Sequence, residues 1–238
     1  MKIVYSLLIA SMLCACTRDN VLTRAEKKAG YALLFDGKST QGWRGAFMNE
    51  FPKKGWVVRD GTLLGELSDG GEAADAGDIV SIKKYRNFDL SFDWKLGKLG
   101  NSGVKYLVEE KLPKATGGSQ PGYEYQLIDD ADFIYNDKHL PADIKTGSLY
   151  QIAAANKPDV DISTWHRSRI VFNQDQIEHY LDGKLIVSIN RKSKAFMDGF
   201  QQSKFKSFPN YPLIQEGHIL LQDHGHNVAF KNIKIKEL

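Results

Sequence analysis

The stretch Phe88-Asp89-Leu90-Ser91-Phe92-Asp93-Trp94-Lys95 alternates a large apolar side chain with a polar one along its whole length. Successive side chains of a β-strand point to opposite faces, so this alternation predicts a strand with one face buried in a core. Further strands are predicted at residues 104–108, 123–128, 167–172, 219–221 and 228–235. The chain is therefore expected to consist mainly of β-strands.

The turn signals agree with this expectation. The pairs Asp60-Gly61 and Asp182-Gly183 each lie between apolar runs, which is typical of tight β-hairpins. No long segment with helical periodicity follows Gly30, and only residues 195–202 suit a short helix. Many short strands separated by turns predict an all-β sandwich or barrel.

The N-terminal segment has the features of an export signal. A positive start is followed by an apolar stretch, residues 3–13, that is too short to anchor stably across a bilayer. The sequence Leu13-Cys14-Ala15-Cys16 fits a lipoprotein cleavage box in which Cys16 carries the lipid; a plain secretory signal is the alternative. Both cysteines of the chain lie here, so no cysteine nucleophile or disulfide is expected in the domain that follows.

We expect three parts in the chain. Residues 1–16 form the lipoprotein signal peptide. Residues 17–30 form a tether with a short helix, because Thr23 and Glu26 have the spacing of a capping box and Gly30 can end the helix. Residues 31–238 form a single domain, since no internal repeat or flexible linker divides them. Segments 68–77 and 109–121 have the composition of surface loops and are expected at the mouth of a site.

The net charge of the chain bears on which classes of molecule it can bind. Lys and Arg number 32 against 29 Asp and Glu, which gives a net charge of +3 over 238 residues. No long basic run occurs, so binding to nucleic acid is not expected. The hydrophobic fraction of 42% is that of an ordinary globular domain with a substantial core.

Acid–base side chains follow the strand at 219–221. Gln222, Asp223 and His224 come directly after it, and imidazole titrates near neutrality, which suits proton transfer. Four residues could in principle ligate a metal, although their spacing matches no metal motif: His218, Asp223, His224 and His226. Binding of a divalent metal by these residues therefore stays an open alternative.

The strand 123–128 carries a second candidate set. Glu124 and Gln126 share one face, while the aromatic Tyr123 and Tyr125 share the other. A carboxylate beside an amide, flanked by aromatic rings, suits a sugar; an ordinary solvent-facing polar strip is the alternative.

Four further residues have open interpretations. Asn101 and Ser102 follow Gly100 and could bind a hydroxyl or cap a turn. Lys105 lies inside an apolar strand, either as a functional amine or as an exposed lysine. His179 is in phase with apolar neighbours, as a core or rim histidine is.

Several short motifs occur in an informative order: Leu34-Phe35-Asp36-Gly37, Gly42-Trp43, Gly77-Asp78-Ile79-Val80, Asn101-Ser102-Gly103, Thr146-Gly147-Ser148-Leu149-Tyr150, Ser203-Lys204-Phe205-Lys206 and the run from Leu221 to Gly225. In order and spacing, this set resembles the 3-keto-disaccharide hydrolase family, also described as 3-keto-glucoside lyases or hydratases and formerly as a domain of unknown function. The resemblance covers residues 31–238.

The resemblance implies a fold. It predicts a concanavalin-like jelly roll, in which two antiparallel sheets form a sandwich with a site on the concave face, as in laminarinase-type glycosidases. However, the Glu-x-Asp-x-x-Glu pattern of those glycosidases is absent, because Gln126 stands where a second acid is needed. A conventional two-carboxylate mechanism would have to recruit Asp129 or Asp93.

The resemblance also implies a chemistry. A ketone at C3 of a glucoside acidifies the proton at C2, so a base can remove it, the C1 substituent leaves, and water can add back. Glu124 or His224 is the expected base or acid, with Asp223 orienting His224 and Lys105 or a divalent metal stabilising the enolate. The residues expected to hold substrate hydroxyls are Asn101, Ser102, Gln126, Tyr150, His179 and Gln222.

Location and partners follow from the same resemblance and from the N-terminus. We expect a cell-envelope enzyme in the periplasm or at the outer membrane, held by the lipid on Cys16 alone, with a small carbohydrate as substrate. An oxidoreductase partner would supply the 3-keto sugar. The alternatives are a non-catalytic carbohydrate-binding lipoprotein, since the same sandwich serves both roles, and a conventional glycosidase.

Overall fold

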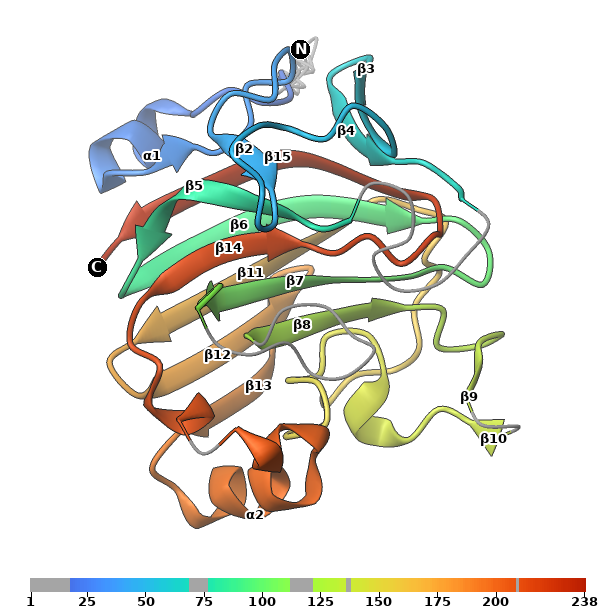
Figure 1. Ribbon diagram of the computed structural model, residues 1–238, viewed down its shortest axis with the longest axis vertical. Coiled ribbons are helices and arrows are strands. Elements are labelled where there is room, and N and C mark those ends of the chain that lie inside the picture. Colours follow the sequence, from blue (N-terminus) through green and yellow to red (C-terminus); the bar gives the residue numbers. More distant parts are fainter. Residues whose placement is uncertain (1–17, 69–76, 112–121, 136–137, 209) are drawn as a thin grey trace, which may run out of the picture.

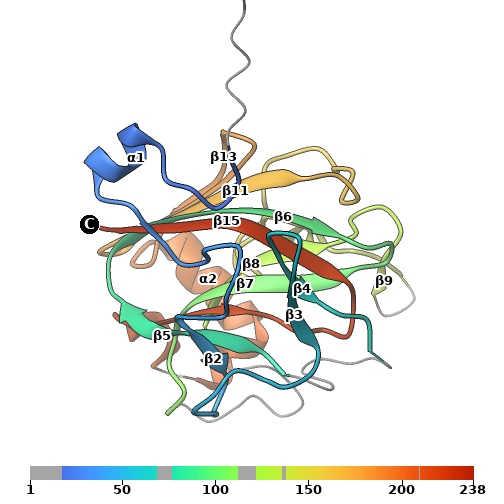
Figure 2. The same cartoon turned by 90° about the horizontal axis from the view of Figure 1, so that it is seen from above.

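The computed structural model describes residues 18–68, 77–111, 122–135, 138–208 and 210–238. These residues form two antiparallel sheets packed face to face, with short helices at the edges (Figures 1 and 2). The predicted signal peptide, its Cys16 and most of both predicted mouth loops lie outside the described residues. The predicted all-β sandwich is confirmed.

The larger sheet has eight strands in the order β13-β12-β11-β6-β15-β4-β3, and β1 pairs with β15. Its strands are β1 (Ala32–Leu33), β3 (Trp56–Arg59), β4 (Thr62–Gly65), β6 (Phe88–Leu96), β11 (His166–Asn173), β12 (Gln176–Leu181), β13 (Lys184–Asn190) and β15 (Val228–Glu237). The second sheet has five strands in the order β2-β5-β14-β7-β8. They are β2 (Trp43–Gly45), β5 (Ile79–Tyr85), β14 (Gly217–Leu221), β7 (Asn101–Val108) and β8 (Tyr123–Ile128).

The remaining elements lie around the sandwich. They are α1 (Arg24–Ala29), the short pair β9 (Ile134–Tyr135) and β10 (Lys138–His139), η1 (Ala142–Ile144), α2 (Lys194–Gln202), η2 (Lys204–Ser207) and η3 (Tyr211–Leu213). The capping box is present, since Thr23 and Glu26 each accept a hydrogen bond from the other's backbone N–H, and Gly30 ends α1 with φ 89°. No described helix is both long and apolar enough to cross a bilayer.

The alternating stretch became β6 as predicted. Its apolar side chains at positions 88, 90, 92 and 94 are all fully buried between the sheets. The intervening Asp89 and Asp93 face outward, yet they are also buried, because Arg169 and Arg167 of β11 pair with them at 2.7 and 2.6 Å. Cross-strand ion pairs therefore cover the outer side of β6.

Both predicted hairpins are confirmed. Asp60 and Gly61 have φ values of 49° and 73° between β3 and β4, and Asp182 and Gly183 have 47° and 80° between β12 and β13. Two successive left-handed residues form the type I′ turn, whose twist matches that of the flanking strands. Asp-Gly is one of the pairs that enter this conformation at low cost.

The connection from β13 to β14 is anchored from within. Arg191 is almost fully buried and donates hydrogen bonds to the Ile214 carbonyl at 2.5 Å and to Asp175 at 2.8 Å. Its guanidinium also lies 4.8 Å from the centroid of Phe172. These contacts fix the start and end of the connection, so α2 and η2 are held beside the edge of the five-stranded sheet (Figure 1).

Candidate functional site on the five-stranded sheet

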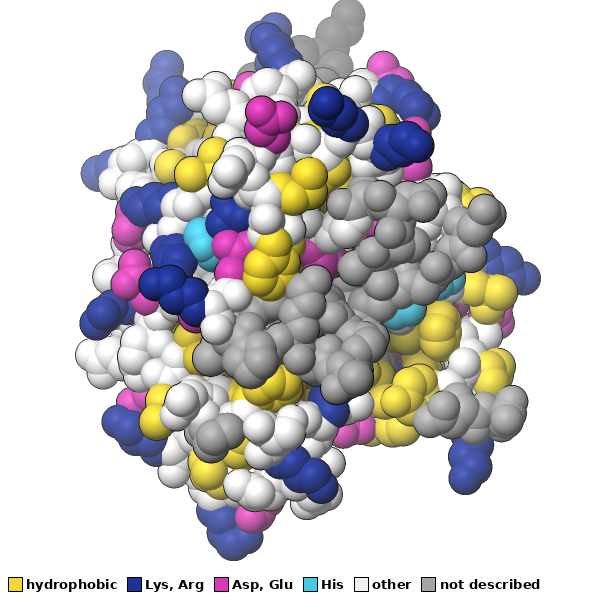
Figure 3. Space-filling model, in the orientation of Figure 1, with side chains coloured by type: hydrophobic (Ala, Val, Ile, Leu, Met, Phe, Trp, Pro, Cys, Tyr) yellow, Lys and Arg dark blue, Asp and Glu magenta, His cyan; other side chains and the backbone are white. Residues whose placement is uncertain are grey.

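The candidate site lies on the outer face of the five-stranded sheet, near the β8 edge. Gly103 pairs with Gln126 and Lys105 with Glu124 across β7 and β8, so these residues share one face, with Asn101 beside them. The opposite face of the two strands packs into the core. Figure 3 looks onto the outer face, where a few histidine and acidic side chains are visible among lysines and arginines.

A shallow depression on this face collects most of the predicted residues. Its lining comprises Asn101, Glu124, Gln126, Tyr150, Gln222 and His224, all predicted, together with Lys204. Its volume is about 40 Å³, which suits one edge of a sugar ring rather than a whole ring. The residues come from five places in the chain: β7, β8, the segment that follows β14, the loop that follows η1, and the helix η2. Only the tertiary fold brings them together.

Glu124 of this lining belongs to a buried ion pair with Lys105, which does not itself line the depression. Nζ of Lys105 is 3.6 Å from Oε2 of Glu124, and the two side chains are only 5% and 4% exposed. Gly103 makes room for this carboxylate, since a Cβ built there would overlap Oε1 of Glu124 and lie 3.1 Å from its Cδ. The sequence left Lys105 open as a functional amine or an exposed lysine. The structure excludes the exposed lysine, because the side chain is buried and its ammonium faces Glu124.

Two polar atoms in the lining have unused hydrogen-bonding capacity. Oε1 of Gln126 and Nδ1 of His224 are buried and have no hydrogen-bond partner among the described residues. Nε2 of Gln126 makes only a long contact, 3.5 Å, with Oδ1 of Asn101. Buried polar groups normally pair, so these atoms are available to the hydroxyls of a ligand.

Lys204 is the site residue that sequence reasoning did not select. Its ammonium lies 4.8 Å from the ring centroid of Tyr150 and 5.5 Å from that of Phe205. Its backbone N–H donates to Oε1 of Gln151 at 3.0 Å, which ties η2 to the loop that carries Tyr150. The basic and aromatic composition of the β13–β14 connection was the available signal.

Asp223 does not take the expected role. Its Oδ1 accepts a hydrogen bond from the backbone N–H of Gly225 at 3.0 Å, and its own N–H donates to Asp78 at 2.9 Å. Its side chain lines a separate depression with Lys53 and Lys54. Among the described contacts, Asp223 stabilises the turn after β14 and does not orient the His224 ring, which corrects the expectation.

Ser102 and His179 point into the core, which corrects the expectation that they hold substrate hydroxyls. Both are fully buried. The Ser102 hydroxyl donates to the Gln222 carbonyl at 2.8 Å, so it helps to place the end of β14. The alternation of side chains along each strand predicts this orientation, since Ser102 is in phase with core residues of β7 and His179 with core residues of β12.

The His179 ring has a defined tautomer. Nδ1 lies 2.9 Å from the Gly147 carbonyl and Nε2 lies 3.0 Å from the Tyr106 hydroxyl. A carbonyl can only accept, so Nδ1 carries the hydrogen and Nε2 accepts from Tyr106. Burial lowers the pKa of His179 from 6.5 to about 4.

This pKa predicts an acid-sensitive fold. The unfolded state binds a proton at His179 near pH 6.5 and the folded state only near pH 4, so stability is lost as pH falls through this window. The loss from this group is about 3 kcal/mol at pH 4. Urea unfolding of the wild type and His179→Gln at several pH values measures it. A variant whose stability falls as steeply as the wild type's between pH 6.5 and 4 would contradict the assignment.

The described side chains do not assemble a metal centre. Within the described ranges, no group of three or more His, Cys, Asp or Glu side chains is close enough to hold a metal ion. His218 lies apart from His224 and contacts the Ser81 carbonyl at 2.7 Å. The described lining of the depression offers one carboxylate and one imidazole as metal ligands, which are too few to hold a metal ion by themselves.

The carboxylates required by a conventional glycosidase are engaged elsewhere. Oδ1 of Asp129 accepts the N–H of Asp132 and Oδ2 accepts the N–H of Leu99, at 3.2 and 3.0 Å. Asp93 belongs to the other sheet and pairs with Arg167. Glu124 is the only carboxylate among the described residues that line the depression.

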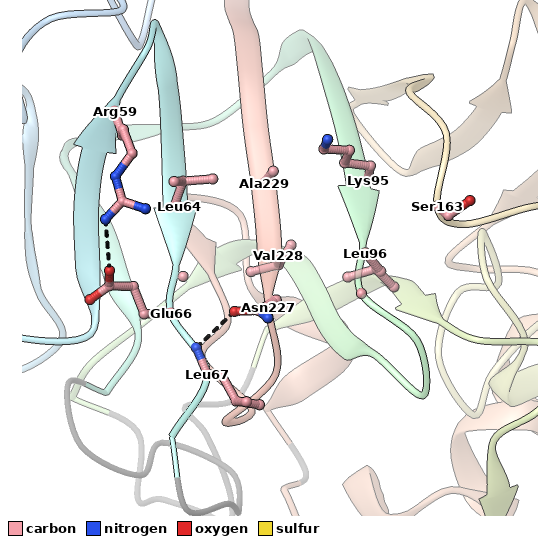
Figure 4. Close-up of a pocket in the computed structure, with 12 residues that line it drawn as sticks. Arg59, Leu64, Glu66, Leu67, Lys95, Leu96, Ser163, Asn227, Val228 and Ala229 are labelled. Carbon is pink, nitrogen blue, oxygen red and sulfur yellow. Dashed lines mark hydrogen bonds and ion pairs between the residues drawn. The ribbon is translucent and has the colours of Figure 1, made fainter.

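A larger cleft of about 700 Å³ lies on the eight-stranded sheet, between β4, β15 and the end of β6 (Figure 4). Its lining includes the aliphatic Leu64 and Val228 and three charged residues. Of these, Arg59 and Glu66 bind each other at 3.2 Å, and the third is Lys95. None of the predicted site residues lines it. This cleft is larger than the depression on the five-stranded sheet, but it does not contain the buried carboxylate–lysine pair found there.

Fold and site together define a class: a jelly-roll β-sandwich of the carbohydrate-active type, with a carboxylate, a lysine, amides and an imidazole on one outer face. The chain belongs to the family of 3-keto-alpha-glucoside-1,2-lyase-like domains, whose model matches residues 30–236. Over 236 residues it is 34% identical to a 3-keto-disaccharide hydrolase of Bacteroides thetaiotaomicron, which covers 88% of this chain and 79% of that protein.

Solved structures agree with the family. A Parabacteroides distasonis protein described as a "putative glycosyl hydrolase" is 37% identical, with a TM-score of 0.80 over 93% of this chain and all of that one. A carbohydrate-binding module from Bacillus subtilis, 14% identical, has a TM-score of 0.52 over 82% of this chain and 96% of that one, which shows the shared fold alone.

Proposed function

We propose that this protein cleaves glycosides whose sugar ring carries a ketone at C3, by removing the proton at C2 and eliminating the C1 substituent. The buried Lys105–Glu124 pair is the observation that carries the proposal. Conventional glycosidases use two carboxylates across the scissile bond, whereas elimination next to a ketone needs one base and a positive charge for the enolate. The name of the Bacteroides relative, a 3-keto-disaccharide hydrolase, supports the same substrate class.

Glu124 is the proposed base. Its carboxylate is confined by Lys105 on one side and by the backbone of Gly103 on the other. When it accepts the C2 proton, Glu124 becomes neutral and the negative charge moves to the enolate oxygen on C3. Lys105 then faces the enolate instead of the carboxylate, so no buried charge is left without a counter-charge.

His224 is the proposed acid. It is half-buried at the edge of the depression, and its Nδ1 has no partner among the described residues. The enolate re-forms the C3 ketone and makes a C1–C2 double bond as the C1–O bond breaks, and the imidazolium protonates the departing oxygen. Addition of water, hydroxyl to C1 and hydrogen to C2, completes a net hydrolysis. Asn101, Gln126, Tyr150 and Gln222 line the same depression and are proposed to hold ring hydroxyls.

The substrate separates this proposal from its alternatives. Purified protein should release 4-nitrophenol from 4-nitrophenyl 3-keto-glucoside and not from the unoxidised glucoside, because only the ketone acidifies C2. NMR of the products distinguishes the enone of a lyase from the 3-keto-glucose of a net hydrolase, and EDTA in parallel tests a metal requirement. Cleavage of the plain glucoside would favour a conventional glycosidase, and binding without turnover would favour a carbohydrate-binding protein.

We also propose that the protein is anchored in the cell envelope through a lipid on Cys16, where an oxidoreductase that oxidises C3 of glycosides would supply its substrate. The support is the lipoprotein-like box around Cys16. Cells fed a labelled fatty acid should label the wild type and not Cys16→Ser, and the variant should leave the membrane fraction. An unlabelled wild type in the soluble fraction would contradict the anchor.

A further inference from the structure

The charges around the depression are not balanced. Glu124 and Lys105 neutralise each other, whereas Lys204 has no carboxylate partner among the described residues. Its ammonium lies 4.8 Å from the ring centroid of Tyr150 and 5.5 Å from that of Phe205, and its backbone N–H donates a hydrogen bond to Oε1 of Gln151. The rim of the site therefore carries one positive charge that nothing described in the protein compensates.

This imbalance matters because only interactions that are stronger in the transition state accelerate the chemical step. Lys105 stabilises the carboxylate of Glu124 before proton transfer and the enolate after it, so much of its attraction is present in the ground state as well. Lys204 faces a neutral sugar before the transfer and a negatively charged one after it. Its attraction appears mainly as charge develops on the substrate.

We propose that Lys204 is a further catalytic residue, whose ammonium, held over Tyr150, stabilises the enolate formed when the C2 proton is removed. This rests on the proposed elimination at a 3-keto sugar. Stacking on Tyr150 limits the freedom of a long side chain, so less entropy is lost when Lys204 meets the substrate. A bound sugar also excludes water from the rim, which strengthens the attraction.

The chain offers a matched control on the same short helix. Lys206 has the same charge and is exposed like Lys204, but it lines a different cleft, with Arg191 and Met197. Lys204→Met and Lys206→Met therefore make the same chemical change in the same helix, inside and outside the site. Lys204→Arg keeps the charge, and circular dichroism and thermal melts of all three variants report whether they fold.

Steady-state kinetics on 4-nitrophenyl 3-keto-glucoside test the proposal. We expect Lys204→Met to lower kcat tenfold or more with KM little changed, Lys204→Arg to retain most of the activity, and Lys206→Met to match the wild type. With substrate deuterated at C2, the isotope effect should grow in Lys204→Met, because proton removal becomes more strongly rate-limiting.

The outcomes separate the two proposals. Suppose the wild type is active. If Lys204→Met is then equally active, or has a raised KM with an unchanged kcat, the assignment of Lys204 is wrong and the elimination stands. If the wild type turns over no 3-keto glycoside, the proposed function fails, and the assignment of Lys204 fails with it. Should Lys204→Met not fold, full activity in a folded Lys204→Gln variant would equally overturn the assignment.

Discussion

Glu124→Gln is expected to lower kcat on a 3-keto glycoside by about a thousandfold, because an amide cannot accept the C2 proton and general-base catalysis contributes up to about four orders of magnitude. The amide keeps the shape of the carboxylate and still offers an oxygen to Lys105. The measurement is kcat of the purified variant beside the wild type on the chromogenic 3-keto glucoside.

Stability must be separated from chemistry in this variant. Glu124→Gln removes the carboxylate that pairs with the buried Lys105 ammonium, and losing one partner of a buried ion pair costs up to about 3–5 kcal/mol. The double variant Lys105→Met, Glu124→Gln removes both charges, so it should recover much of that stability without recovering activity. If the double variant regained activity together with its stability, Glu124 would be a structural residue and the proposed base would be wrong.

Gly103→Ala is expected to lower kcat by about a hundredfold, because a displacement of about 1 Å at a reacting group can cost that much. The added methyl would occupy the place of Oε1 of Glu124, with Cγ and Cδ each 3.1 Å away, so the carboxylate must shift. The backbone of Gly103 does not have the positive φ that would make alanine strained by itself. Kinetics and a denaturation curve measure the two effects separately.

A second glycine provides the control. Gly183 lies in the β12–β13 turn with φ 80° and has open space around its missing Cβ. Gly183→Ala should therefore lose stability through backbone strain, about 1 kcal/mol, while kcat stays at the wild-type value. Equal losses of activity in Gly103→Ala and Gly183→Ala would mean that general destabilisation, rather than displacement of Glu124, explains the effect.

The local sequence predicts the faces of single strands well. In β8, Glu124 and Gln126 face outward because Tyr123 and Tyr125 carry the apolar surface that the core requires. The same period-two rule, applied strictly, excludes Ser102 and His179 from the site, since each is in phase with core residues of its own strand. For His179 the apolar neighbours in phase already indicated a core position, whereas for Ser102 the residue type suggested a hydroxyl-binding role that its strand phase does not support.

The strands, the two Asp-Gly hairpins, the capped first helix and the outward face of Glu124 could all be predicted from local sequence, because each depends on residues close together in the chain. Only the tertiary structure shows which outward-facing side chains from distant parts of the chain become neighbours. In the folded protein, Lys105 pairs with Glu124, Asp223 accepts a hydrogen bond from a backbone N–H, and the ammonium of Lys204 lies over the ring of Tyr150. These outcomes depend on pairing between distant strands and on the packing of a long connection, and no local pattern encodes either.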